Sequence, residues 1–120
     1  MSDARDVATR VMDALNAHDM VRLRNLYSED ARTRRPGWLQ EGDLEGLLSS
    51  YEMDFACVPD ISFQTVSSLA DGPHVVTEVR ITGTNTGPTV LGDFGKALLG
   101  LDVAHVPPSG RPIDLPAVFM

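Results

Sequence analysis

Two charged side chains, Glu78 and Arg35, have the types and surroundings that proton transfer requires. Glu78 lies within a run of Val and Ile residues, where an apolar sheet interior would raise the pKa of a carboxylate and suit it to act as a general base. Alternation along the same run also allows Glu78 to share the opposite, solvent-facing side with Arg80 and Thr82. Arg35 stays protonated and cannot be a base, but its guanidinium can donate to an enolate oxygen or clamp a carboxylate or phenolate. We predict Glu78 and Arg35 as catalytic residues, with solvated surface positions as the alternative for both.

Three further side chains are suited to holding a ligand. Trp38 follows the turn at 36–37 and Tyr51 lies on a predicted helix, so both rings can line the mouth of a site for a flat, ring-shaped molecule. Ordinary core packing at helical spacing is the alternative for Tyr51. The amide of Asn85 can donate to an oxyanion but cannot exchange protons, which favours binding over acid–base chemistry. We predict Trp38, Tyr51 and Asn85 as ligand-binding residues.

Metal ions and cofactors are not expected. The histidines His18, His74 and His105 lie far apart in the sequence, and none has a second ligand at the spacing of a metal site. Cys57 is the only cysteine, so it cannot form a Cys-x-x-Cys pair, and its apolar neighbours predict a buried, inert thiol. The sequence contains neither a phosphate loop nor a dinucleotide fingerprint. Cofactor-free chemistry is the expectation that remains.

The composition bounds the class of protein. A chain of 120 residues has room for one domain, so we treat residues 1–120 as a single domain. The chain has 10 basic and 17 acidic residues and a net charge of −7, which argues against nucleic acid and anionic membranes as partners. The N-terminus lacks the basic start and apolar stretch of a secretory signal, and no run of 18 apolar residues exists. With a single cysteine as well, we expect a cytoplasmic protein.

Apolar periodicity predicts helices first and strands afterwards. Three- and four-residue spacing indicates helices at 4–17 and 19–27, with Asp19 capping the second, and another helix at 43–55. Strands are predicted at 31–35, 61–66, 74–83 and 113–120, with a turn at 71–73 and a short helix at 93–101. Helices gathered on one face of a mainly antiparallel sheet are typical of the α+β class.

Five stretches of sequence resemble one known family. They are Asn-Ala-His-Asp at 16–19, Leu-Tyr-Ser-Glu-Asp-Ala at 26–31, Val-Pro-Asp-Ile at 58–61, Gly-Thr-Asn-Thr-Gly-Pro at 83–88 and Pro-Pro-Ser-Gly-Arg at 107–111. Together they resemble the SnoaL-like polyketide cyclases of the nuclear transport factor 2-like superfamily, which also holds ketosteroid isomerase and scytalone dehydratase. The resemblance implies a cone-shaped α+β barrel, with N-terminal helices packed on a curved, mainly antiparallel sheet. It also implies proton transfer next to a carbonyl as the usual chemistry.

Two departures from the family pattern affect the expected activity. Ketosteroid isomerase has its base, an Asp just before a Pro, where this chain has Arg35. The family also has a further β segment after the strand at 113–120, in the part of the sheet that carries the cyclases' acid–base Asp. We expect this C-terminal strand or strands to be missing here, so that no residue of this chain inherits that role.

The residues and the resemblance together predict a domain that binds a small hydrophobic molecule. As an enzyme it would be a cofactor-free isomerase, cyclase or dehydratase acting on a ring-bearing carbonyl compound. The alternative, favoured by Arg35 and the missing strand, is a non-catalytic ligand-binding or dimerisation module of the same fold; a truncated product that does not act alone is a third possibility. Because helices cover only one face of the sheet, two-fold pairing would cover the partly apolar other face, and we expect a homodimer.

Overall fold

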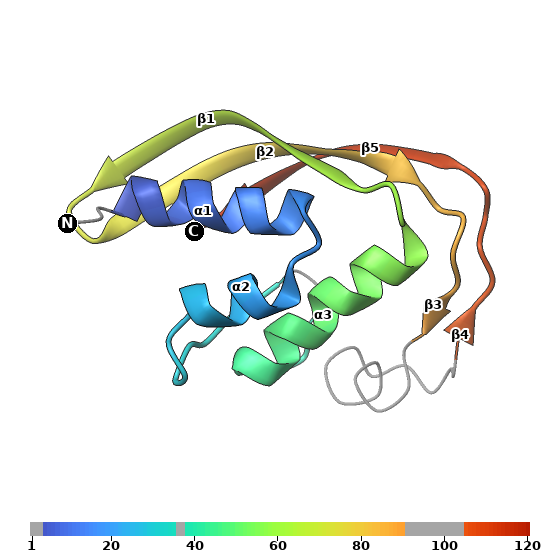
Figure 1. Cartoon of the computed structure of the whole chain (residues 1–120), viewed down its shortest axis with the longest axis horizontal. Coiled ribbons are helices and arrows are strands. Elements are labelled where there is room, and N and C mark those ends of the chain that lie inside the picture. Colours follow the sequence, from blue (N-terminus) through green and yellow to red (C-terminus); the bar gives the residue numbers. More distant parts are fainter. Residues whose placement is uncertain (1–3, 36–37, 91–104) are drawn as a thin grey trace.

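The fold places three helices on one side of an antiparallel sheet (Figure 1). We describe a computed structural model, which covers residues 4–35, 38–90 and 105–120. The elements in chain order are α1 (Ala4–Asn16), α2 (Met20–Leu26), α3 (Leu44–Cys57), β1 (Ser62–Asp71), β2 (His74–Thr84), β3 (Thr89–Val90), β4 (His105–Val106) and β5 (Pro112–Phe119). Among these described residues, no helix is long and apolar enough to cross a membrane.

The helix boundaries follow from local capping. Asp19 precedes α2 and its side chain accepts a hydrogen bond from the backbone N–H of Arg22, while Asp43 does the same for Gly46 at the start of α3. Between α1 and α2, His18 adopts a left-handed backbone conformation with φ 52°, which turns the chain sharply. The predicted helices at 4–17, 19–27 and 43–55 are therefore confirmed to within a few residues.

The main sheet has three strands in the order β1-β2-β5, and both pairings are antiparallel. Phe63 of β1 is opposite Ile81 of β2, which is in turn opposite Leu115 of β5. The predicted turn at 71–73 joins β1 and β2 as a tight hairpin in which Gly72 has φ +58°. The predicted strand at 113–120 is confirmed, and it lies against the free side of β2.

The sheet is not closed into the cone-shaped barrel that the resemblance implied. In the described part of the chain, β1 and β5 are edge strands of a three-stranded sheet, and β3 with β4 forms a separate two-stranded one. Small closed barrels use about eight strands, and three strands cannot curve far enough for their edges to meet. The fold is therefore of the α+β class, with an open, helix-covered sheet in place of the expected barrel.

Two short predicted elements remain, the strand at 31–35 and the helix at 93–101. The segment at 31–35 forms a single bridge rather than a strand: Thr33 and Gly42 exchange two backbone hydrogen bonds of 2.9 and 2.8 Å. The helix predicted at 93–101 lies outside the described residues. A lone bridge is what remains when a short, arginine-rich segment meets a partner for only one residue.

The core lies between the helices and the facing side of the sheet. Its buried apolar residues are Val11, Met12, Ala14, Leu15, Leu23, Leu44, Leu47, Leu48, Tyr51, Val58, Ile61, Phe63 and Val79. A polar clasp fixes α1 to this core, because the Asn16 side chain donates to the Phe63 carbonyl at 2.9 Å and accepts from the Phe63 N–H at 2.8 Å. These two hydrogen bonds hold the end of α1 against β1.

Candidate functional site

An ion pair joins α3 to the segment before it. Asp54 lies on the last turns of α3, and its Oδ2 is 3.6 Å from Nη1 of Arg35. The Asp54 side chain is 23% exposed and that of Arg35 is 40% exposed. Burial raises the pKa of Asp54 above its ordinary value, and the Arg35 guanidinium opposes that rise by favouring the carboxylate. Asp54 is thus an acidic group with a raised pKa that retains access to solvent.

A pair of tyrosine hydroxyls lies one helical turn before Asp54. The hydroxyl oxygens of Tyr51, on α3, and Tyr27, just after α2, are 3.1 Å apart. Tyr51 is 5% exposed and Tyr27 is half-buried against the core. Burial raises the pKa of both phenols, so both stay neutral hydrogen-bond donors at neutral pH.

Trp38 completes this group through Arg35. The Arg35 guanidinium carbon lies 5.9 Å from the centroid of the Trp38 ring, a cation–π distance. We call Tyr27, Arg35, Trp38, Tyr51 and Asp54 the α3 cluster. Three of its members, Arg35, Trp38 and Tyr51, were predicted as site residues from the sequence. The five residues of the cluster come from three separate segments. The cluster combines one acid, one cation, two phenols and an indole.

Glu78 lies apart from the α3 cluster, on the outer face of the sheet. Its neighbour Val79 is 1% exposed and packs in the core, so alternation directs Glu78 away from the helices. Glu78 is exposed, and its Oε2 accepts a hydrogen bond of 3.1 Å from the Ser67 hydroxyl on β1. Of the two placements open to Glu78 from the sequence, the structure shows the solvent-facing one.

Asn85 ties three segments together just after β2. Its side-chain amide donates to the carbonyls of Cys57 and Gly87 at 2.9 and 3.0 Å, and its side-chain oxygen accepts from the N–H of Ser109 at 2.8 Å. Its backbone N–H also donates to the Arg111 carbonyl at 3.0 Å. Both amide protons are therefore used within the fold, and the predicted role of Asn85 in ligand binding stays a prediction.

Sequence reasoning missed Asp54 and Tyr27 as members of the site. Neither residue is among the catalytic and ligand-binding residues predicted from the sequence. A usable signal was present for Asp54, since it lies three residues after Tyr51 and seven after Leu47, on the buried side of the same helix. No local pattern links Tyr27 to Tyr51, because their contact depends on how α2 packs against α3.

An apolar groove of about 300 Å³ runs between α1, the β1–β2 hairpin and the end of β5. Val7 and Val11 of α1 line one wall, Val75 and Phe119 line the other, and Tyr27 also borders the groove. No charged side chain is among the described residues that line it. Tyr27 is therefore shared between the groove and the α3 cluster.

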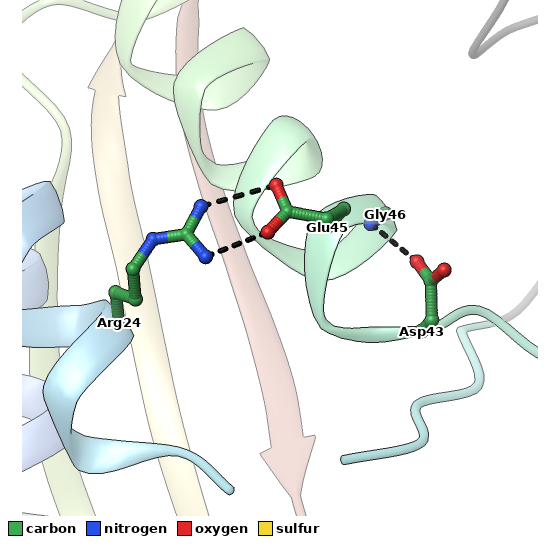
Figure 2. A network of polar contacts seen from close by, with 4 residues as sticks. All are labelled: Arg24, Asp43, Glu45 and Gly46. Atoms are coloured by element: carbon green, nitrogen blue, oxygen red, sulfur yellow. Dashed lines mark hydrogen bonds and ion pairs between the residues drawn. The ribbon is translucent and has the colours of Figure 1, made fainter. Parts of the chain in front are cut away.

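A second concavity, of about 320 Å³, is a polar surface feature between α2 and α3. Figure 2 shows the paired contacts there: Arg24 donates to both carboxylate oxygens of Glu45, at 2.6 and 3.0 Å, beside the Asp43 cap of α3. The two side chains of the ion pair are more than half exposed. This pair links α2 to α3 at the surface.

Comparisons with known proteins indicate the same family that the sequence motifs resemble. A model of the SnoaL-like domain family matches residues 8–120. The fold is similar to that of IdmH from Streptomyces antibioticus, a proposed polyketide cyclase, with a TM-score of 0.74 and 23% identity over 98% of this chain and 80% of that one. A proposed SnoaL-like polyketide cyclase from Jannaschia sp. has a TM-score of 0.64 and 25% identity, over 96% of this chain and 72% of that one. Another, from Shewanella putrefaciens, has a TM-score of 0.63 and 22% identity, over 98% of this chain and 77% of that one. No curated protein matches the sequence.

Proposed function

The chain belongs to the SnoaL-like domain family of the nuclear transport factor 2-like superfamily, and on that basis we propose that it binds a small, hydrophobic, ring-bearing carbonyl compound and transfers a proton next to the carbonyl. Isomerase, cyclase and dehydratase reactions of this kind need no cofactor. The observation that carries the proposal is the α3 cluster, where an acid with a raised pKa lies beside a cation and two neutral phenols.

The proposed chemistry assigns a base and hydrogen-bond donors. The Asp54 carboxylate takes a proton from the carbon next to the carbonyl, the electron pair moves onto the carbonyl oxygen, and Asp54 returns the proton to the same or another carbon. Arg35 and the phenol of Tyr51 are the donors available to the enolate oxygen, and Trp38 offers a flat surface to a ring. Burial supports this assignment because it brings the pKa of a carboxylate closer to neutral pH.

Glu78 remains a second proposal for the base. On an open outer face it would need another surface to exclude water from the reaction, and its hydrogen bond with Ser67 would have to give way. The α3 cluster supports Asp54 more directly, since that carboxylate is already largely buried and faces a cation at 3.6 Å.

Hydrogen exchange on a cyclic ketone tests the proposal. In D2O, the protein should accelerate exchange of the protons next to the carbonyl of 2-tetralone, followed by NMR. Asp54→Asn should lower that acceleration by about a hundredfold or more, as expected for loss of a general base. Glu78→Gln tests the second proposal: with Asp54 as the base it should leave the rate unchanged, and a comparable loss in Glu78→Gln alone would assign the base to Glu78. Exchange no faster than in buffer, or full activity in Asp54→Asn, would rule out Asp54 as the base.

A non-catalytic ligand-binding module of the same fold is the second candidate. The observation that favours it is the ion pair itself, because Arg35 neutralises the only acid of the α3 cluster. In a module of this kind the pair would orient a bound ligand without proton transfer. Binding of 2-tetralone without accelerated exchange would support this candidate over the enzyme.

We also propose that the chain pairs with a second copy through the outer face of the sheet. Leu69 and Val76 lie opposite each other on that face and are 74% and 41% exposed, and Val118 on β5 is 59% exposed. Covering these side chains would remove apolar surface from water. Sedimentation equilibrium at micromolar concentration should show a dimer, and Val118→Glu should shift it toward the monomer. A monomer in the unmodified protein would refute this proposal.

A further inference from the structure

Gly42 is not a member of the α3 cluster, but its backbone lies against the ring of one member, Trp38. A Cβ added at Gly42 would be 2.5 Å from Cζ3 and 3.3 Å from Cε3 of the indole. Trp38 in turn lies beside Arg35, whose guanidinium pairs with Asp54. We propose that Gly42 is a positioning residue of the cluster: the absence of a side chain there lets Trp38 hold Arg35 against Asp54. The inference rests on the proposed function for the role of Asp54, and it adds the residue that positions its partner.

The bridge before α3 fixes the place of Gly42. Thr33 and Gly42 exchange backbone hydrogen bonds of 2.9 and 2.8 Å, so the chain leaves the bridge at residue 33 and returns to it at residue 42. The next residue, Asp43, caps the helix that carries Asp54. Gly42 is itself buried. The ring of Trp38 therefore packs on backbone that is held on one side by the bridge and on the other by the start of α3.

A glycine is needed at this position because of the contact and not because of the backbone conformation. Gly42 does not have the positive φ found at Gly72, Gly83 and Gly110, so its backbone conformation is open to other residues. The obstacle to a side chain is the indole, since a distance of 2.5 Å is too short for two carbon atoms that are not bonded. Trp38 is half-buried, so we expect its ring, rather than the bridged backbone, to be displaced by a methyl group.

Displacing the ring would act on Asp54 through Arg35. The guanidinium carbon lies 5.9 Å from the ring centroid, and Nη1 lies 3.6 Å from Oδ2 of Asp54, so one cation contacts both groups. The other titratable groups near Asp54 are Tyr51 and Cys57 on α3, and burial keeps both neutral at neutral pH by raising the pKa of each. Arg35 is thus the cation that favours the carboxylate among the described residues around Asp54. A less firmly held guanidinium favours the protonated acid.

Gly42→Ala tests the inference with two readouts. Trp38 is the only tryptophan of the chain, so its fluorescence reports on the ring directly: the emission should move to longer wavelength and quenching by acrylamide should increase. Proton binding by Asp54, followed by NMR of its side-chain carboxyl carbon, should strengthen by about two- to fivefold, the equivalent of one exposed cation–π contact. Gly72→Ala, a glycine variant in the β1–β2 hairpin, is the matched control and should change neither readout.

A double variant separates the contact from general destabilisation. Trp38→Ala alone should strengthen proton binding by Asp54 to a similar extent, and adding Gly42→Ala should change it no further, because the ring that meets the new methyl group is gone. If Gly42→Ala alone does not fold, as judged by circular dichroism, recovery of the fold in the double variant supports the contact, and no recovery overturns it. An unchanged emission, an unchanged Asp54 titration, or equal effects of Gly42→Ala with and without Trp38 would also overturn the inference.

None of these readouts requires turnover, so the inference and the proposed catalysis can fail separately. If Gly42→Ala moves the Asp54 titration but 2-tetralone exchange is not accelerated, the positioning role stands and the enzyme proposal fails. If exchange is accelerated and the titration does not move, the enzyme proposal stands and the positioning role fails. Where both hold, the pH dependence of exchange in Gly42→Ala should move to higher pH by the same amount as the titration.

Discussion

Replacing Arg35 by Met should raise the pKa of Asp54 further. In the unmodified protein, burial raises that pKa and the Arg35 guanidinium opposes the rise. Met keeps much of the apolar length of the side chain and removes the charge 3.6 Å from the carboxylate. The Asp54 carboxylate is then still desolvated by burial but no longer has the attraction of the guanidinium, so its protonated form becomes more favourable.

The size of the change follows from the geometry. At 3.6 Å the Coulomb attraction is about 1 kcal/mol in water and about 4 to 5 kcal/mol at an effective dielectric constant near 20. Because the Arg35 side chain is 40% exposed, solvent screening places the interaction near the lower limit, at about 1 to 2 kcal/mol. That energy corresponds to about a five- to thirtyfold change in the equilibrium for proton binding by Asp54, in the direction of a higher pKa.

An NMR titration of the side-chain carboxyl carbon of Asp54 measures this directly. Arg34→Met, at the exposed neighbouring position, is the matched control and should leave the Asp54 titration in place. An unchanged or lowered pKa in Arg35→Met would refute the reasoning, because it would mean that the ion pair contributes nothing to the charge state of Asp54.

The sign of the effect on stability is also fixed. An acid whose pKa is higher in the folded than in the unfolded state binds a proton more tightly when folded, so stability falls as pH rises from the ordinary Asp value through the folded value. In Arg35→Met this loss should be larger and extend to higher pH. Urea denaturation between pH 4 and 8 measures it, and Asp54→Asn should remove this contribution.

Two further predictions concern the scaffold. Asn16→Ala should lower the free energy of unfolding by about 1 to 3 kcal/mol, because it leaves two partly buried backbone groups of Phe63 without their side-chain partner. Urea denaturation measures the loss, and a value below about 0.5 kcal/mol would contradict a stabilising role for these two hydrogen bonds. Gly87→Ala should lower the free energy of unfolding by about 3 kcal/mol or more, since a Cβ would lie 1.8 Å from the Ala56 carbonyl oxygen. Gly72→Ala, at a position with φ +58° and open space around it, should lower it by about 1 to 2 kcal/mol. Similar melting temperatures for the two variants would contradict this difference.

Local sequence signals were enough to predict most of the elements. Asp19 and Asp43 cap their helices through contacts within three residues, and Gly72 supplies the turn conformation of the hairpin. Each of these features is decided by neighbours along the chain. Barrel closure is a property of the whole sheet, and it depends on how many strands are present and how they tilt. The resemblance implied closure that the three described strands of the main sheet do not provide.

The candidate site was only partly predictable for the same reason. Arg35, Trp38 and Tyr51 were chosen by residue type, and packing of α3 brings them together. Asp54 was missed because its partner Arg35 lies far away in sequence, and the contact depends on how α3 packs over the segment before it. For Glu78, apolar neighbours favoured burial and alternation favoured exposure, and alternation was correct since it follows from strand geometry alone.

The hydrogen bonds that Asn85 makes to Ser109 and Arg111 have a consequence for the order in which the fold assembles. The β1–β2 hairpin joins neighbouring segments, whereas β5 must close a long loop before it can pair with β2, a step with a larger entropic cost. Asn85 holds Ser109 and Arg111 at the end of β2, immediately before β5 begins. If β5 begins to pair with β2 at these hydrogen bonds and pairing proceeds toward Phe119, the register of the two strands is fixed from the first step. We expect amide hydrogens of β5 to exchange faster than those of the hairpin, with protection increasing toward the Asn85 end of the strand.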